Sequence, residues 1–281
     1  LTLGRDIGEY INYALMGLVL TGIGAPLLGL FSTILFDGNC KKFFSRIGDI
    51  PSYLIVLLII AVIGPFGAMP RCITVSYSAI KPYVPQMSML VYTLIAGASV
   101  LLCIFKRDFI LPILGNLLSP ILIFSLVAVI IKGFYTVSDP VATDFTKLQA
   151  FKQGVVVGYD TMDLLGSVFF AVIVWDLLKE KFTHQGHDIK ATTLAPICFM
   201  ASAIGGTLLA LIYLGLSKAA AENMTVLQGV AQEDLLSALA IHVLGAKYAF
   251  VANIALALAC ITTVISLAAT VATAPSFAGW S

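Results

Sequence analysis

Long apolar runs constrain this chain more than any other feature of its sequence. A helix needs roughly 20 apolar residues to cross a bilayer. About seven such segments follow one another, near residues 11–36, 52–80, 87–105, 109–132, 155–178, 191–216 and 242–273. Only 11% of the residues are charged, whereas a soluble domain is nearer a quarter charged. We therefore predict an all-α polytopic membrane protein in which residues 1–281 form a single transmembrane domain.

The basic residues predict which loops face the cytoplasm. The connections 37–50, 106–108 and 179–190 are short and rich in lysine and arginine, and such loops favour the cytoplasmic side. The opposite connections, 133–154 and 217–241, are longer and mix acids with bases. Within the second of these, residues 222–240 are expected to form a short surface helix.

The second apolar segment carries polar interruptions at membrane depth. Pro65 and Pro70 each remove a backbone donor, and lipid cannot satisfy the carbonyl groups that are then left over. Arg71 costs at least a few kcal/mol there unless it has a partner or reaches water. These three residues therefore indicate a segment that faces protein or an aqueous pathway.

A second polar stretch lies where the fifth span begins. It comprises Gly158, Tyr159, Asp160, Thr161, Met162 and Asp163, followed by the apolar run 164–175. The two acids could cap a helix that starts at the membrane surface, because carboxylates favour helix N-termini. Alternatively, a half-helix over 145–157 enters the membrane first and unwinds at 158–163. Broken helices of this kind form substrate sites in secondary transporters.

The last apolar segment contains Ala259, Thr262 and Thr263. Threonines in membrane helices often donate back to a carbonyl group one turn earlier, which is the structural explanation for this pair. The functional alternative is that the two hydroxyl oxygens and the Ala259 carbonyl oxygen coordinate a small cation, since hard cations prefer oxygen ligands.

Other classes of function find little support in the sequence. The five cysteines are scattered without a Cys-x-x-Cys pair, so neither a disulfide framework nor a zinc site is expected. Common hydrolase motifs are missing, and no second carboxylate motif accompanies Tyr159-Asp160 to build an intramembrane aspartyl protease. No basic run suggests nucleic acid. We expect neither an enzyme nor a bound cofactor.

Four motifs together resemble the bacterial branched-chain amino acid carrier family of the BrnQ type. The chain contains Ile-Gly-Pro-Phe and Ala-Met-Pro-Arg within 63–71, Thr-Gly-Ile-Gly-Ala-Pro at 21–26, Gly-Tyr-Asp-Thr-Met-Asp at 158–163, and Ala-Cys-Ile-Thr-Thr at 259–263. The motifs occur in the family's order and extend over nearly the whole chain.

The resemblance implies a secondary active transporter in the bacterial cytoplasmic membrane. It would import leucine, isoleucine and valine by symport with sodium or protons, on a LeuT-type inverted-repeat bundle. Residues 158–163 would contact the substrate, Pro65, Pro70 and Arg71 would line the site, and Ala259, Thr262 and Thr263 would bind sodium. Membrane lipid is the other expected partner, and the oligomeric state is left open.

Departures from the family pattern leave alternatives open. The resemblance implies that the family's first span and its last three or four are absent, so a truncated, non-transporting remnant is one alternative. Cys72 replaces a threonine, Ser78 a glutamate and Asp160 a leucine, so another amino acid permease of the same superfold is a second alternative. Because Ser78 removes the acid nearest to Arg71, Asp160 or Asp163 becomes the expected partner of that arginine.

Overall fold

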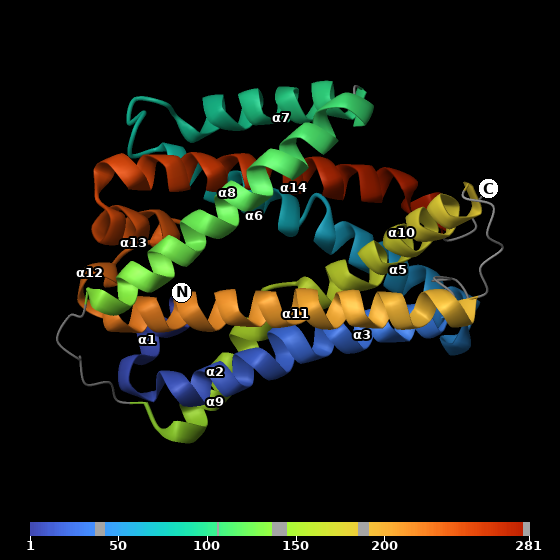
Figure 1. Ribbon diagram of the computed structural model, residues 1–281, viewed down its shortest axis with the longest axis horizontal. Coiled ribbons are helices and arrows are strands. Elements are labelled where there is room, and N and C mark those ends of the chain that lie inside the picture. The colour runs from blue at the N-terminus through green and yellow to red at the C-terminus, as the bar shows by residue number, and fades with distance from the viewer. Residues whose placement is uncertain (37–42, 106, 137–144, 185–190, 278–281) are drawn as a thin grey trace.

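The computed structural model describes residues 1–36, 43–105, 107–136, 145–184 and 191–277. All regular structure within these ranges is helical, which confirms the predicted all-α class. Most of the helices lie side by side along the long axis of the molecule (Figure 1). Five helical stretches in the described ranges are long and apolar enough to cross a membrane: Thr2–Leu35, Asp49–Ile80, Lys147–Val172, Leu194–Glu222 and Ala246–Ala269.

The first half of the chain contains an interrupted helix at each of its first two predicted spans. The first consists of α1 (Thr2–Ile7), the 3-10 turn η1 (Gly8–Tyr10), α2 (Ile11–Val19), the π-helical turn η2 (Leu20–Gly24) and α3 (Ala25–Leu35). After the short turn η3 (Ser45–Ile47), the second divides into α5 (Asp49–Ile63) and α6 (Ala68–Ile80). This differs from the single helix expected over 52–80. Two further helices follow, α7 (Met89–Phe105) and α8 (Arg107–Tyr135).

The second half contains another broken helix. It consists of α9 (Lys147–Asp160) and α10 (Asp163–His184), and it starts eight residues before the expected span. The long α11 (Ala191–Glu222) leads into the short α12 (Met224–Leu227) and α13 (Leu235–Leu244), where a surface helix was expected. The last helix is α14 (Ala246–Phe277).

The helix ends separate into two sides of the molecule. In Figure 1, α3, α7 and α10 run toward the right-hand side, whereas α12 and α13 lie at the left. These three helices precede the loops predicted to be cytoplasmic, and their C-terminal ends point to the same side of the molecule. Residues 37–42, 106 and 185–190 of these loops lie outside the described residues.

The apolar interior is divided into separate clusters. The first comprises α1, α2 and α9 around Leu3, Ile7 and Ala150. The second joins α8, α11, α13 and the start of α14 around Val129 and Leu235. The third joins α5 to α10 through their buried side chains, which include Val56, Ile59, Val168, Phe169 and Val172.

Glycines allow α2 and the following π-helical turn to approach α9 closely. A Cβ on Gly154 would collide with the carbonyl oxygen of Ala14, and one on Gly158 would collide with the hydroxyl group of Thr21. The same hydroxyl group donates across the contact to the Val155 carbonyl oxygen, at 2.9 Å. Small residues at such contacts are the usual means by which membrane helices pack backbone to backbone.

Candidate functional site

The break between α9 and α10 is short and well supported by local bonds. A capping box between Thr146 and Gln149 starts α9, and this helix ends at Asp160, where the Thr161 hydroxyl group donates to the Gly158 carbonyl oxygen at 2.8 Å. Met162 then has φ 59°, the only positive φ of a non-glycine residue in the described ranges. Backbone of this kind costs about 1–3 kcal/mol and clusters at functional sites. The broken-helix interpretation is therefore confirmed, with only Thr161 and Met162 between the two helices.

The break between α5 and α6 meets the first one. It covers Gly64–Gly67, and its amide groups find acceptors nearby: Gly64 N donates to the Ile60 carbonyl oxygen at 2.9 Å and Phe66 N to that of Ala61 at 3.1 Å. Pro70 lies in the first turn of α6, where a missing N–H group leaves no helical bond unmade. A Cβ on Gly67 would lie 3.3 Å from Met162 Cε. The two breaks are therefore in contact.

Arg71 joins these two broken helices. Its Nη1 donates to the carbonyl oxygen of Asp160 at 2.6 Å, and that carbonyl group ends α9. The last carbonyl groups of a helix lack intrahelical donors and favour a cation. Asp160 is therefore the partner of Arg71, as expected, but it uses its backbone carbonyl group and not its carboxylate. The end of α9 supplies this carbonyl group.

Tyr213 of α11 contributes a residue that sequence reasoning missed. Its hydroxyl group donates to Asp163 Oδ2 at 2.7 Å, at the start of α10. A lone tyrosine in the middle of the apolar run 208–216 was the available signal. The bond fixes one side of the α9–α10 break to α11, while Arg71 fixes the other side to α6.

An inner cavity of about 650 Å³ opens beside the break. Its wall is mainly apolar and includes Ile63, Phe170 and Leu267, and Thr161, Met162 and Asp163 supply polar groups at one end. Three of the six predicted substrate residues therefore line this cavity, together with Arg71. Pockets of this size with a few polar groups are typical of small-molecule sites.

The other three predicted substrate residues lie elsewhere. Gly158 packs against Thr21, and Tyr159 is exposed on α9, with 60% of its surface accessible. Asp160 lines a separate outer cavity of about 390 Å³, next to α1. These three residues belong to the last turn of α9, so they lie on different sides of the helix.

The threonine pair on α14 is arranged as the structural explanation requires. Both Thr262 Oγ1 and Thr263 Oγ1 donate to the Ala259 carbonyl oxygen, each at 2.8 Å. Thr263 also lines the inner cavity. The three oxygens are therefore close together, and each hydroxyl oxygen keeps lone pairs for a cation. No group of three or more His, Cys, Asp or Glu side chains in the described part of the chain could hold a metal ion.

Comparison with known proteins identifies relatives along the whole described chain. The family profile described as "Branched-chain amino acid transport protein" matches residues 1–278. The branched-chain amino acid permease BrnQ of Salmonella typhimurium is 27% identical over 270 residues, which cover 94% of this chain and 60% of the relative. The permeases BraB and BrnQ of Bacillus subtilis are 29% and 30% identical, again over 94% of this chain.

The chain spans about three fifths of the length of these curated relatives. No solved structure matches it, so the expected inverted-repeat arrangement stays a prediction. The helices and the relatives together make it a multi-pass protein of the bacterial cytoplasmic membrane. With its profile match and its four motifs, the chain belongs to the branched-chain amino acid transport protein family.

Proposed function

We propose that this chain forms the substrate-binding part of a secondary active transporter that imports leucine, isoleucine and valine together with sodium. The observation that carries the proposal is the inner cavity, in which an apolar wall meets the polar break between α9 and α10. An aliphatic amino acid has the same division between an apolar side chain and a charged head group. The names of the relatives support this class of substrate.

The head group would lie at the start of α10. The amide groups of Leu165 and Gly166 donate to the Met162 carbonyl oxygen, at 3.1 and 3.2 Å. The first amide groups of a helix favour an anion, so the substrate carboxylate would lie at this N-terminus. The Asp163 carboxylate, oriented by Tyr213, would accept from the ammonium group.

The side chain of the substrate would pack on the apolar wall. Ile63 ends α5, Phe170 lies two turns into α10, and Leu267 comes from α14. Burying an aliphatic side chain of this size contributes about 1.5–3 kcal/mol. The charged lining residues, Arg71 and Asp163, belong to the polar region at the α9–α10 break, so the apolar wall favours leucine, isoleucine and valine over polar amino acids.

The coupling ion would be held by Thr262, Thr263 and the Ala259 carbonyl oxygen. Binding sodium there requires the two hydroxyl groups to turn their lone pairs toward the ion and away from their present donation to Ala259. Since Thr263 lines the inner cavity, ion and substrate would occupy neighbouring positions, and each would stabilise the conformation that binds the other.

Sodium-dependent leucine uptake by proteoliposomes containing the protein tests this proposal. Thr262→Ala should raise the sodium concentration for half-maximal uptake at least tenfold. Thr207→Ala is the matched control, because this exposed residue of α11 makes the same backbone bond, 2.7 Å to Ala203, away from both cavities. Unchanged sodium dependence in Thr262→Ala would refute the ion site. Uptake driven by a pH gradient without sodium would instead assign proton coupling.

A second candidate function is transport of a cationic or polar amino acid. The specific observation in its favour is Asp160, a carboxylate where the family pattern has leucine. Competition for leucine uptake by aliphatic, aromatic and cationic amino acids separates the two candidates. Strong competition by lysine and weak competition by isoleucine would favour the second.

A further inference from the structure

The outer cavity adjoins the inner one. Arg71, Thr161 and Tyr213 line both cavities. Arg71 donates to the Asp160 carbonyl oxygen and Tyr213 to Asp163, so both residues are bound to the α9–α10 break. The other lining residues of the outer cavity, which include Asp6, Asp160 and Leu216, do not line the inner one.

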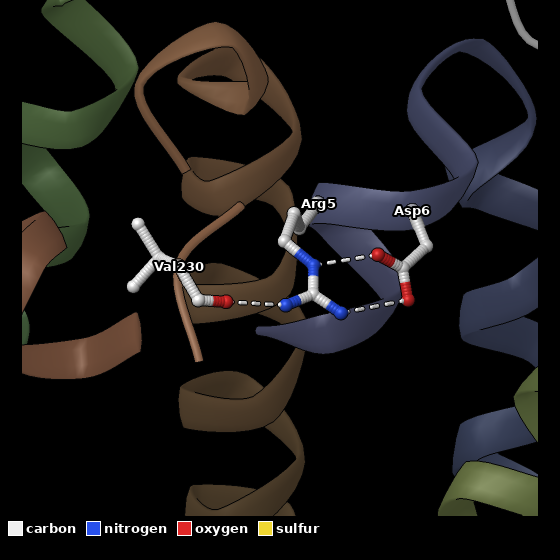
Figure 2. A network of polar contacts seen from close by, with 3 residues as sticks. All are labelled: Arg5, Asp6 and Val230. Atoms are coloured by element: carbon white, nitrogen blue, oxygen red, sulfur yellow. Dashed lines mark hydrogen bonds and ion pairs between the residues drawn. The ribbon is translucent and has the colours of Figure 1, made fainter. Parts of the chain in front are cut away.

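One of its two pairs of opposite charges is already satisfied. Figure 2 shows that Arg5 directs all three nitrogens to acceptors: Nε and Nη2 donate to the two carboxylate oxygens of Asp6, at 2.6 and 3.2 Å, and Nη1 donates to the Val230 carbonyl oxygen at 2.7 Å. Both oxygens of Asp6 are occupied by the same contact. This pair therefore connects α1 to the segment before α13, and it has little capacity left for a ligand.

The second pair is available. Arg71 has five N–H donors, and one of them is used, for the Asp160 carbonyl oxygen. The side chain of Asp160 is exposed, and its carboxylate accepts no hydrogen bond from the described residues. Both side chains line the outer cavity, yet no ion pair joins them in the described part of the chain. Each charge can therefore meet a group of a ligand that enters the cavity.

The remaining wall suits a small amphiphilic molecule. Leu18, Val157 and Leu216 supply apolar surface beside the two charges, and the volume of about 390 Å³ is sufficient for one small ligand. A cation and an anion that line one cavity, next to an apolar surface, match a zwitterionic head group with an aliphatic side chain. A simple cation or a simple anion would leave one of the two charges unpaired.

We propose that the outer cavity is a second binding site for an α-amino acid. The Asp160 carboxylate would accept hydrogen bonds from the ammonium group, and the free donors of Arg71 would bind the carboxylate. Leu18, Val157 and Leu216 would contact the side chain. The choice of an aliphatic amino acid as ligand rests on the proposed function, whereas the zwitterionic class follows from the two charges.

Equilibrium binding of radiolabelled leucine to the detergent-solubilised protein tests this site. The wild type should bind two leucines per chain. Asp160→Asn keeps the size of the side chain and should weaken one of the two sites at least tenfold, leaving the other at its wild-type affinity. Asp160→Glu should restore most of the lost affinity. Glu9→Gln removes an exposed carboxylate outside both cavities and should change neither site.

A ligand without the ammonium group tests whether the Asp160 carboxylate binds that group. Binding of 4-methylpentanoate, which has the carboxylate and side chain of leucine, should be insensitive to Asp160→Asn at the outer site. One leucine per chain, with an affinity that Asp160→Asn does not change, would overturn the second site and leave the proposed function intact. No leucine binding by the wild type would refute the proposed function itself.

Discussion

Replacing Gly158 by alanine tests the close contact between α9 and the π-helical turn η2. Beyond the collision with the Thr21 hydroxyl group, the new Cβ would lie 2.8 Å from Gly22 N. Carbon atoms normally approach other heavy atoms to about 3.5–4.0 Å, so the two elements would have to separate by roughly 0.7–1.2 Å. Because Gly22 N is a backbone atom, no side-chain rotation can relieve this contact.

The size of the effect follows from two opposing contributions. Overpacking costs about 1–3 kcal/mol, and a collision with backbone belongs at the upper end of that range. Alanine also favours a helix over glycine by about 1 kcal/mol. The net destabilisation is then about 2 kcal/mol. At roughly 2–4 °C per kcal/mol for a chain of this size, Tm should fall by about 4–8 °C.

Thermal unfolding in detergent, followed with a thiol-reactive dye, measures this change, since the buried Cys198 becomes reactive when the fold opens. Gly97→Ala is the matched control on α7, because no atom lies within 4 Å of its new Cβ. Its Tm should stay the same or rise slightly. Equal Tm values for the two variants would refute the close contact. If Gly158→Ala abolished leucine binding without changing Tm, Gly158 would be a substrate-binding residue, as the sequence predicted.

Two further predictions concern the bonds around the cavities. Tyr213→Phe should lower leucine uptake about tenfold, because a hydrogen bond to a charged group contributes about 1.5–3 kcal/mol. The control Tyr77→Phe loses a bond to the Met87 carbonyl oxygen and should leave leucine uptake unchanged. Equal uptake by both variants would contradict the role of Tyr213. Arg5→Gln should speed limited proteolysis of residues 228–234, since the bond to Val230 is lost; an unchanged cleavage rate would mean that other contacts hold this segment.

The long apolar segments were predictable from the sequence, whereas the broken helix was one of two interpretations of the stretch 158–163. Helical membrane spans follow from the length of apolar runs, because the backbone of a span has no other way to satisfy its polar groups. The polar stretch 158–163, which begins with a glycine, was compatible with such a break and also with a helix cap at the membrane surface. The extent of that break was not predictable, since Gly158, Tyr159 and Asp160 are compatible with a last helical turn and belong to α9.

The partners of the polar side chains depend on tertiary contacts that no local pattern contains. Arg71 is far in sequence from the Asp160 carbonyl group, and Tyr213 is 50 residues from Asp163. Pro65 signalled a disturbed helix, but a kink and a full interruption at Gly64–Gly67 leave the same trace in the sequence. Gly158 was assigned to the substrate because a glycine pattern does not reveal whether backbone or ligand makes the close approach.

The division of the apolar interior has a mechanical consequence. The α9–α10 break lies between two clusters: α10 shares buried side chains with α5, whereas α9 packs with α1 and α2. A rotation at Thr161–Met162 would leave the buried side chains within each of these two clusters together. Because Gly29 of α3 packs on Leu164 and Val168 of α10, α3 would have to move with α10, and the π-helical turn η2 between α2 and α3 would bend together with the break.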